Sequence, residues 1–173
     1  MRELSTKLKR LDRELLITMR SRGHTDGLDA AAVALGRAGN NALIWVIVGL
    51  IMAAIDNSRW ESWLICAALG PFAILVNFAI KKWARRPRPP LEELGLDPLG
   101  EAPSSLSFPS AHATSSFAVA TAMFRVDPAM AAAFAVALLI ALDRPYLGMH
   151  YPSDVLVGAL LGIAIGLLVP LTF

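Results

Sequence analysis

Five long apolar segments constrain the fold of this chain more than any other feature. They cover residues 42–55, 60–83, 111–126, 129–142 and 155–171. The 173-residue chain is 55% hydrophobic with a mean hydropathy of +0.54, which is more apolar surface than a soluble domain of this size can bury. The segments therefore predict membrane-spanning helices. Several are shorter than the ~20 residues that usually cross a bilayer. We expect their helices to extend into flanking polar residues, or the bilayer to thin locally.

The region before these segments has a different pattern. Leucines recur at helical spacing over residues 2–20, with charged residues around the rest of the helix surface: Leu4, Leu8, Leu11 and Leu15. This pattern predicts an amphipathic helix in the membrane interface. A surface helix that packs on a soluble partner is the alternative. A second short helix is predicted over 28–37, and the sequence Gly39-Asn40-Asn41 interrupts it.

The predicted fold class is all-α: a polytopic membrane helix bundle of about five transmembrane helices with an N-terminal amphipathic interfacial helix. We expect one domain, 1–173, in which 1–38 form the interfacial region and 39–173 the transmembrane core. The stretch 85–109 holds six of the eleven prolines, so it is not a span, and it is long for a simple connection. We predict that it forms a lid over a site. A flexible linker with no further role is the alternative.

Three polar clusters lie at the ends of the apolar segments. They read Lys81-x6-Arg88-Pro89, Pro109-Ser110-Ala111-His112 and Arg144-x5-His150-x3-Asp154. The alternation of spans places all three clusters on one face of the membrane, so their side chains can converge. Fixed cations and directed N–H groups suit a phosphate dianion. Ser110 is placed to cap the helix that follows it, whose first free amides can also face an anion.

In this order, the clusters resemble the three signatures of the type 2 phosphatidic acid phosphatase (PAP2) superfamily, in its integral-membrane branch. The resemblance implies a metal-independent phosphoric monoester hydrolase. His150 is then the nucleophile that forms a phosphohistidine, and Asp154 holds its imidazole. His112 is the general acid for the leaving oxygen and then the base that activates water. The phosphate-binding residues that it implies are Lys81, Arg88, Ser110, Ala111 and Arg144.

No cofactor is expected. Carboxylates at metal-ligand spacing are absent from the sequence, and the three cations already neutralise a phosphate. Two positions depart from the family pattern. Ala111 stands where the second signature usually has Gly, and Asp143 precedes Arg144 where the third usually begins with Ser. A backbone amide is all that position 111 has to offer, so its methyl group is tolerable unless it crowds the phosphate. Asp143 either pairs with Arg144 or repels the phosphate.

Each site residue also has a simpler interpretation. Basic residues at a helix end often contact lipid headgroups, which applies to Lys81, Lys82, Arg85, Arg86 and Arg88. Ser110 is then a plain helix cap, Asp154 a first-turn acid favoured by the helix dipole, and the histidines interfacial residues. For these simpler interpretations to hold, every residue would have to occupy its position in the three clusters by coincidence. We therefore favour the interpretation that the clusters form the active site of an enzyme. The alternatives of another class are a non-catalytic membrane scaffold and a lipid transporter.

Charge predicts the orientation. Fourteen of the sixteen basic residues lie on the motif-bearing face; without Lys81, Arg88 and Arg144, eleven remain there against Arg59 and Arg125 on the other face. The positive-inside rule then points the site to the cytoplasm of a multi-pass cell-membrane protein. The short chain and its Ala-rich, Arg-rich composition resemble small actinobacterial family members, which implies decaprenylphosphoryl-5-phosphoribose as the substrate. Phosphatidylglycerophosphate, phosphatidic acid and polyprenyl pyrophosphate remain open.

The expected partners are a lipid phosphate substrate and membrane lipids, with no nucleic acid. Glycines also recur every four residues in the last apolar segment, at Gly158, Gly162 and Gly166. A glycine stripe lets two helices approach closely in lipid. It therefore predicts either tight packing against a neighbouring span of the same chain or a homodimer.

Overall fold

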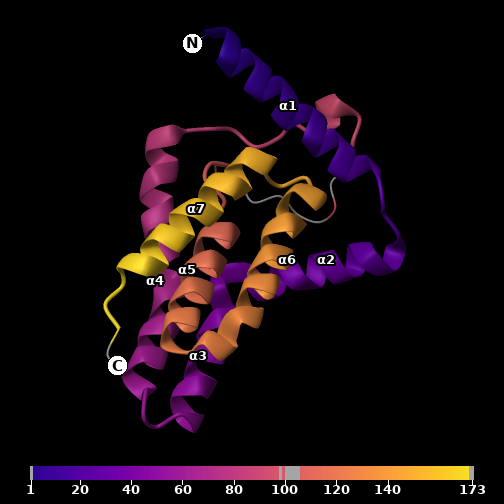
Figure 1. The fold of residues 1–173 in the computed structure, drawn as a ribbon. Coiled ribbons are helices and arrows are strands. Elements are labelled where there is room, and N and C mark those ends of the chain that lie inside the picture. The colour runs from indigo at the N-terminus through magenta and orange to yellow at the C-terminus, as the bar shows by residue number, and fades with distance from the viewer. Residues whose placement is uncertain (1, 98, 100–105, 172–173) are drawn as a thin grey trace.

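The computed structural model describes residues 2–97, 99 and 106–171, and its regular structure there is helical (Figure 1). The α-helices are α1 Arg2–Ser21, α2 Asp26–Gly39, α3 Leu43–Ile55, α4 Trp60–Ala84, α5 Ala111–Val126, α6 Ala132–Tyr146 and α7 Pro152–Leu168. Short 3₁₀ helices occur at Asn40–Ala42, Glu92–Leu94 and Pro128–Ala131. The predicted all-α class is confirmed, with helices at all five predicted span positions.

Helix α5 is the central helix of the bundle. It packs against α4, α6 and α7, and most of its residues are buried. These residues are mainly small, so its neighbours approach closely, and several of the hydroxyls find partners inside the protein. The Trp45 indole of α3, for example, donates to the Ser116 Oγ over 2.9 Å. A helix surrounded by protein has little contact with lipid, so α5 can keep its 16 residues without the lengthening that was one of the two expected alternatives.

Among the described residues, three helical stretches are long and apolar enough to cross a membrane: Asp26–Ile55, Trp60–Ala84 and Pro128–Tyr146. The apolar helix Pro152–Leu168 is shorter. Two helices extend into flanking polar residues, as the sequence analysis expected. Helix α6 continues past 142, so Arg144 lies in its last turn. Helix α7 starts at Pro152, which suits the first helical position, and it ends before Pro170, which has no N–H to continue the ladder.

The predicted break after the second helix is a sharp bend between α2 and α3. Asn41 and Ala42 adopt positive φ angles of 54° and 59°, a left-handed conformation that ends an α-helix. Thr25 caps the other end of α2, where its Oγ1 accepts from the Leu28 amide over 3.2 Å. The bend turns α2 away from the direction of α3 and lays it across α6 (Figure 1).

Helix α1 presents two different faces. The predicted leucine stripe is turned outward: Leu8, Leu11 and Leu15 are 58%, 51% and 44% exposed. The buried face is instead a row with a spacing of four residues: Asp12, Leu16 and Arg20. An outward apolar stripe is what an interfacial helix needs. The inward face ties α1 to the rest of the protein.

The glycine stripe of α7 packs on α5 within the chain. A Cβ atom added at Gly158, Gly162 or Gly166 would lie within 2.7 Å of a backbone oxygen of Ser110, Thr114 or Ala118. Of the two predicted alternatives, the structure therefore has the packing within one chain. The homodimer stays a prediction, and it would have to use residues beside the glycines, such as the exposed Leu156 and Leu160.

Candidate active site

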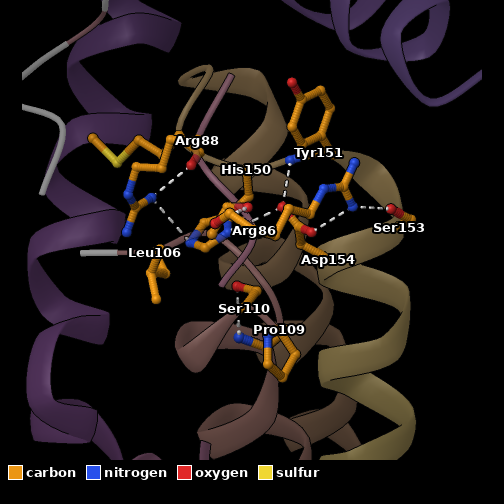
Figure 2. A network of polar contacts seen from close by, with 12 residues as sticks. Arg86, Arg88, Leu106, Pro109, Ser110, His150, Tyr151, Ser153 and Asp154 are labelled. Carbon is orange, nitrogen blue, oxygen red and sulfur yellow. Dashed lines mark hydrogen bonds and ion pairs between the residues drawn. The ribbon is translucent and has the colours of Figure 1, made fainter. Parts of the chain in front are cut away.

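The three predicted clusters meet at one end of the bundle. There the last turns of α4 and α6 bring Lys81 and Arg144, and the first turns of α5 and α7 bring His112 and Asp154. Two contacts join the clusters directly. The Arg88 Nη1 lies 3.3 Å from the His150 Nε2 (Figure 2). The Ser110 amide donates to the Asp154 carbonyl over 2.9 Å. The sequence-based expectation that the clusters converge is therefore met.

His150 and Asp154 form a buried pair, with 3% and 0% of each residue exposed. The Nδ1 of His150 lies 3.5 Å from the Oδ2 of Asp154, longer than an ordinary N–H···O hydrogen bond. The same oxygen accepts from the Tyr151 amide over 2.9 Å (Figure 2). The pair is thus aligned through Nδ1, and Nε2 is the ring nitrogen that faces Arg88.

The environment keeps the His150 ring neutral. Burial lowers the pKa of His150 from 6.5 to about 4, and the positive charges of Arg88 and Lys81 act in the same direction. The Asp154 carboxylate opposes them but does not reverse the shift. A neutral imidazole retains a lone pair, so at neutral pH the ring has the charge state that a nucleophile requires.

A tight turn between α6 and α7 places His150 at the site. Gly148 adopts a positive φ of 77°, and the Met149 amide donates to the Arg144 carbonyl over 2.9 Å. A Cβ atom at Gly148 would lie 2.6 Å from the Leu91 Cδ1, so a larger residue there would also require the Leu91 side chain to shift. This explains how Arg144 and His150 reach one site from the end of one helix and the loop that follows it.

Three cations surround the imidazoles. Arg88 donates to the Met149 carbonyl over 2.5 Å, and the Lys81 ammonium donates to the Leu106 carbonyl over 2.8 Å. Arg144 is buried and pairs with Asp143, as one of the two sequence-based alternatives expected. The Nε of Arg144 has no hydrogen-bond partner in the described part of the chain. The cluster therefore places several N–H donors around the two histidines.

The second cluster starts helix α5 as predicted. Ser110 is its N-cap, and its Oγ accepts from the Ala113 amide at 3.5 Å. Asn77, one turn before Lys81, fixes this start: its Nδ2 donates to the Pro109 carbonyl over 3.2 Å and to the Thr114 Oγ1 over 2.9 Å. The first turn of α5, with Ala111 and His112, is thereby held against α4.

Helix α2 forms a wall of the site, which the sequence analysis did not expect. The His112 Nε2 lies 3.2 Å from the Gly36 carbonyl oxygen, a distance at which it donates. A Cβ atom at Gly36 would overlap the Arg144 guanidinium, and one at Gly39 would lie 2.9 Å from the His112 Cδ2. The sequence feature that could have predicted this close packing is the pair of glycines, three residues apart on one face of the helix.

Sequence reasoning also missed Arg86, which it grouped with the headgroup-binding cations. The Arg86 guanidinium donates to the Asp154 Oδ1 and to the Ser153 Oγ, each over 2.7 Å (Figure 2). Its other nitrogen donates to the Asp12 Oδ2 over 2.6 Å. The sequence feature that could have identified Asp12 is an acidic residue within a basic stretch, one helical turn before Leu16.

Both described ends of the 85–109 stretch lie at the site. The Ser107 amide donates to the Arg86 carbonyl over 2.9 Å, and the Ser107 Oγ donates to the Pro87 carbonyl over 2.8 Å. Residues 98 and 100–105 are outside the described part of the chain. The position of these two ends agrees with a segment that covers the site. That this segment moves as a lid stays a prediction. Within the described residues, no three His, Cys, Asp or Glu side chains gather as metal ligands do.

Residues 61–173 match the PAP2 superfamily. The chain belongs to this superfamily. Among curated proteins, it is 39% identical over 145 residues to the decaprenylphosphoryl-5-phosphoribose phosphatase of Mycobacterium tuberculosis, covering 83% of this chain and 79% of that protein. It is 32% identical over 136 residues to the phosphatidylglycerophosphatase B of Bacillus subtilis, covering 72% of this chain and 63% of that protein. Both relatives are named as phosphatases.

The fold agrees with this membership. The crystal structure of LpxE from Aquifex aeolicus superposes on this PAP2 protein with a TM-score of 0.74 at 24% sequence identity, covering 91% of this chain and 93% of that chain. Family, relatives and apolar helices together make the protein a PAP2-type membrane phosphatase, a phosphoric monoester hydrolase. The resemblance and the enzyme class predicted from the three clusters are confirmed.

Proposed function

We propose that this PAP2 protein hydrolyses a lipid-linked phosphomonoester through a phosphohistidine on His150. The Nε2 atom attacks phosphorus because Nδ1 faces Asp154. As the N–P bond forms, the P–O bond to the leaving group breaks, and His112 donates a proton to the departing oxygen. A water molecule, deprotonated by His112, then attacks the phosphohistidine and releases inorganic phosphate.

The cations stabilise the charge that develops during transfer. Arg88 lies beside Nε2, where the phosphoryl group enters. Arg144 lies against Gly36, whose carbonyl contacts the His112 Nε2, so Arg144 and His112 border the same space. Lys81 lies in the last turn of α4 at the same end of the bundle. Fixed donors in a buried site stabilise a trigonal-bipyramidal phosphoryl group more strongly than they do in water. The Ala111 amide, at the N-terminus of α5, supplies a further donor.

The proposed substrate is decaprenylphosphoryl-5-phosphoribose. The observation that carries this choice is the 39% identity, over 83% of this chain, to the M. tuberculosis protein named for that activity. Phosphatidylglycerophosphate is the second candidate, because of the 32% identity to the B. subtilis enzyme. The first comparison covers a larger share of this chain and of the relative than the second does, which favours the first candidate.

The test is a substrate screen with purified protein in detergent and EDTA. Phosphate release is compared for decaprenylphosphoryl-5-phosphoribose, phosphatidylglycerophosphate, phosphatidic acid and a polyprenyl pyrophosphate. We expect the first to give the highest kcat/KM, no loss of rate in EDTA, and inhibition by orthovanadate, which adopts the geometry of the transition state. A strict requirement for magnesium contradicts the mechanism. A higher kcat/KM for phosphatidylglycerophosphate moves the assignment to the second candidate. Release from none of them favours a scaffold or transporter.

We also propose that the site faces the cytoplasm. At the opposite end of the bundle, the Arg59 guanidinium pairs with Asp56 and Asp127 at 2.7 and 2.9 Å, so its charge is compensated within the fold. At the site end, exposed basic residues such as Lys9 and Arg13 of α1 add to the cluster at the end of α4. Carrying so many cations across a membrane against its potential is costly, which supports this orientation.

Cysteine labelling tests the orientation. Cys66 is buried, and we replace it with Ser before introducing Glu93→Cys at the site end or, as a matched control, Asn57→Cys at the opposite end. Both positions are exposed. A membrane-impermeant thiol reagent should label the Asn57→Cys protein in intact cells, and label the Glu93→Cys protein after lysis only. The reverse pattern places the site outside the cytoplasm.

A further inference from the structure

Helix α1 contacts the site through Asp12. This side chain is buried, in contrast to the charged residues beside it in the sequence, Arg13 and Glu14. Its Oδ1 accepts from the Ser153 amide over 2.9 Å, and its Oδ2 accepts from the Ser153 hydroxyl and from Arg86, each over 2.6 Å. All three donors belong to residues at the site end of the bundle.

The bond to the Ser153 amide caps helix α7 from another part of the chain. Ser153 is the second residue of α7, so its N–H is one of those that the helix cannot satisfy itself. A carboxylate at this end also interacts favourably with the helix dipole. Asp12 therefore holds the turn of α7 that carries Asp154 and follows His150.

The bond to Arg86 reaches Asp154 directly. Arg86 lies between the two carboxylates, 2.6 Å from the Asp12 Oδ2 and 2.7 Å from the Asp154 Oδ1. Its guanidinium also stacks 4.1 Å from the centre of the Tyr151 ring, which fixes its plane. With Oδ1 held by Arg86 and Oδ2 by the Tyr151 amide, the Asp154 carboxylate has one orientation, and Oδ2 faces His150 (Figure 2).

We propose that Asp12 of helix α1 is a positioning residue for the His150–Asp154 pair, acting through Arg86 and Ser153. The proposal rests on the proposed function of His150 as the nucleophile. It makes the N-terminal helix part of the catalytic unit. The outward leucine stripe lies on the same helix, so the helix that is predicted to lie in the membrane interface would also set the orientation of the Asp154 carboxylate.

Asp12→Asn removes the charge and retains the shape. We expect kcat to fall about tenfold to a hundredfold, the range for a small misplacement of reacting groups, with KM within about twofold of wild type. Glu14→Gln is the matched control, because Glu14 is an exposed acid on the same helix that pairs with Arg10; its kcat should be unchanged. Asp12→Glu, which restores the carboxylate, should recover part of the loss.

A double-mutant cycle separates positioning from general stability. If Asp12 acts in part through Arg86, the loss of kcat in the double variant Asp12→Asn/Arg86→Gln should be smaller than the two single losses combined. Additive losses, or a kcat for Asp12→Asn within twofold of wild type, would overturn the proposal. If Asp12→Asn does not fold, Ser153→Ala is the second test: it removes the hydroxyl contacts alone, and an unchanged kcat counts against the proposal.

A second measurement distinguishes this proposal from the proposed function. Orthovanadate binding is followed through the rise in Tm of the purified wild-type and variant proteins, which needs no lipid substrate. We expect weaker binding to Asp12→Asn than to Glu14→Gln. If wild type hydrolyses none of the lipid phosphates, the proposed function fails. The difference in vanadate affinity between the two variants still decides for or against the positioning role.

Discussion

His150→Ala is expected to lower phosphate release by ~10⁴-fold or more, the range for loss of a nucleophile in a covalent mechanism. The structure offers no second imidazole in its place, because the His112 Nε2 is engaged by the Gly36 carbonyl and His24 stacks on Tyr146 with ring centroids 4.2 Å apart. Initial rates and trapping of radiolabelled phosphate on the quenched protein measure the effect. The variant should incorporate no label.

His24→Ala is the matched control for this substitution. His24 contacts Asp29 at 2.8 Å, and its interactions lie among α1, α2 and α6, outside the residues proposed to act on phosphate. We expect this variant to keep most of the wild-type rate. If His150→Ala retains a substantial fraction of the rate, or still incorporates label, His150 is not the nucleophile. An equal loss in both variants would point to structural damage.

The second large effect concerns stability. Gly162→Ala should lower the free energy of unfolding by roughly 3 kcal/mol, at the upper end for overpacking, because a Cβ atom there would lie 2.4 Å from the Thr114 carbonyl oxygen and 2.9 Å from the Ala118 nitrogen. Both atoms are backbone of α5, so no side chain can move aside. Thermal unfolding in detergent should show a decrease in Tm of about 10 °C.

Gly27→Ala provides the same substitution in an open position. A Cβ atom at Gly27 would have no neighbour within 4 Å, and alanine is the better helix former. Its Tm should therefore equal or slightly exceed that of wild type. The activity of Gly162→Ala should fall together with its stability, since the α5–α7 contact also aligns Ser110 with Asp154. An unchanged Tm for Gly162→Ala would mean that α5 and α7 can move apart with little loss of folding free energy.

The sequence was sufficient to predict the helices and the meeting of the three polar clusters. Apolar runs fix where helices lie in a membrane protein because backbone groups must be satisfied within each segment. Local rules then set the ends: Ser110 caps α5, and Pro152 begins α7. Since α4 to α7 alternate in direction, polar residues at their ends gather at one end of the bundle. That is why residues as distant as Lys81 and His150 were correctly expected to meet.

The tertiary structure alone decided what surrounds this constellation. The contacts of Asp12 with Ser153 and of Gly36 with His112 join residues 141 and 76 positions apart. No local periodicity encodes such pairs, since an acid on an amphipathic helix and a glycine in a short helix each have common local explanations. Their roles depend on where the bend at Asn41 and Ala42 directs α2, and on which face α1 turns inward. The sequence determines the chemistry of the site, whereas the packing of α1 and α2 determines which residues orient it.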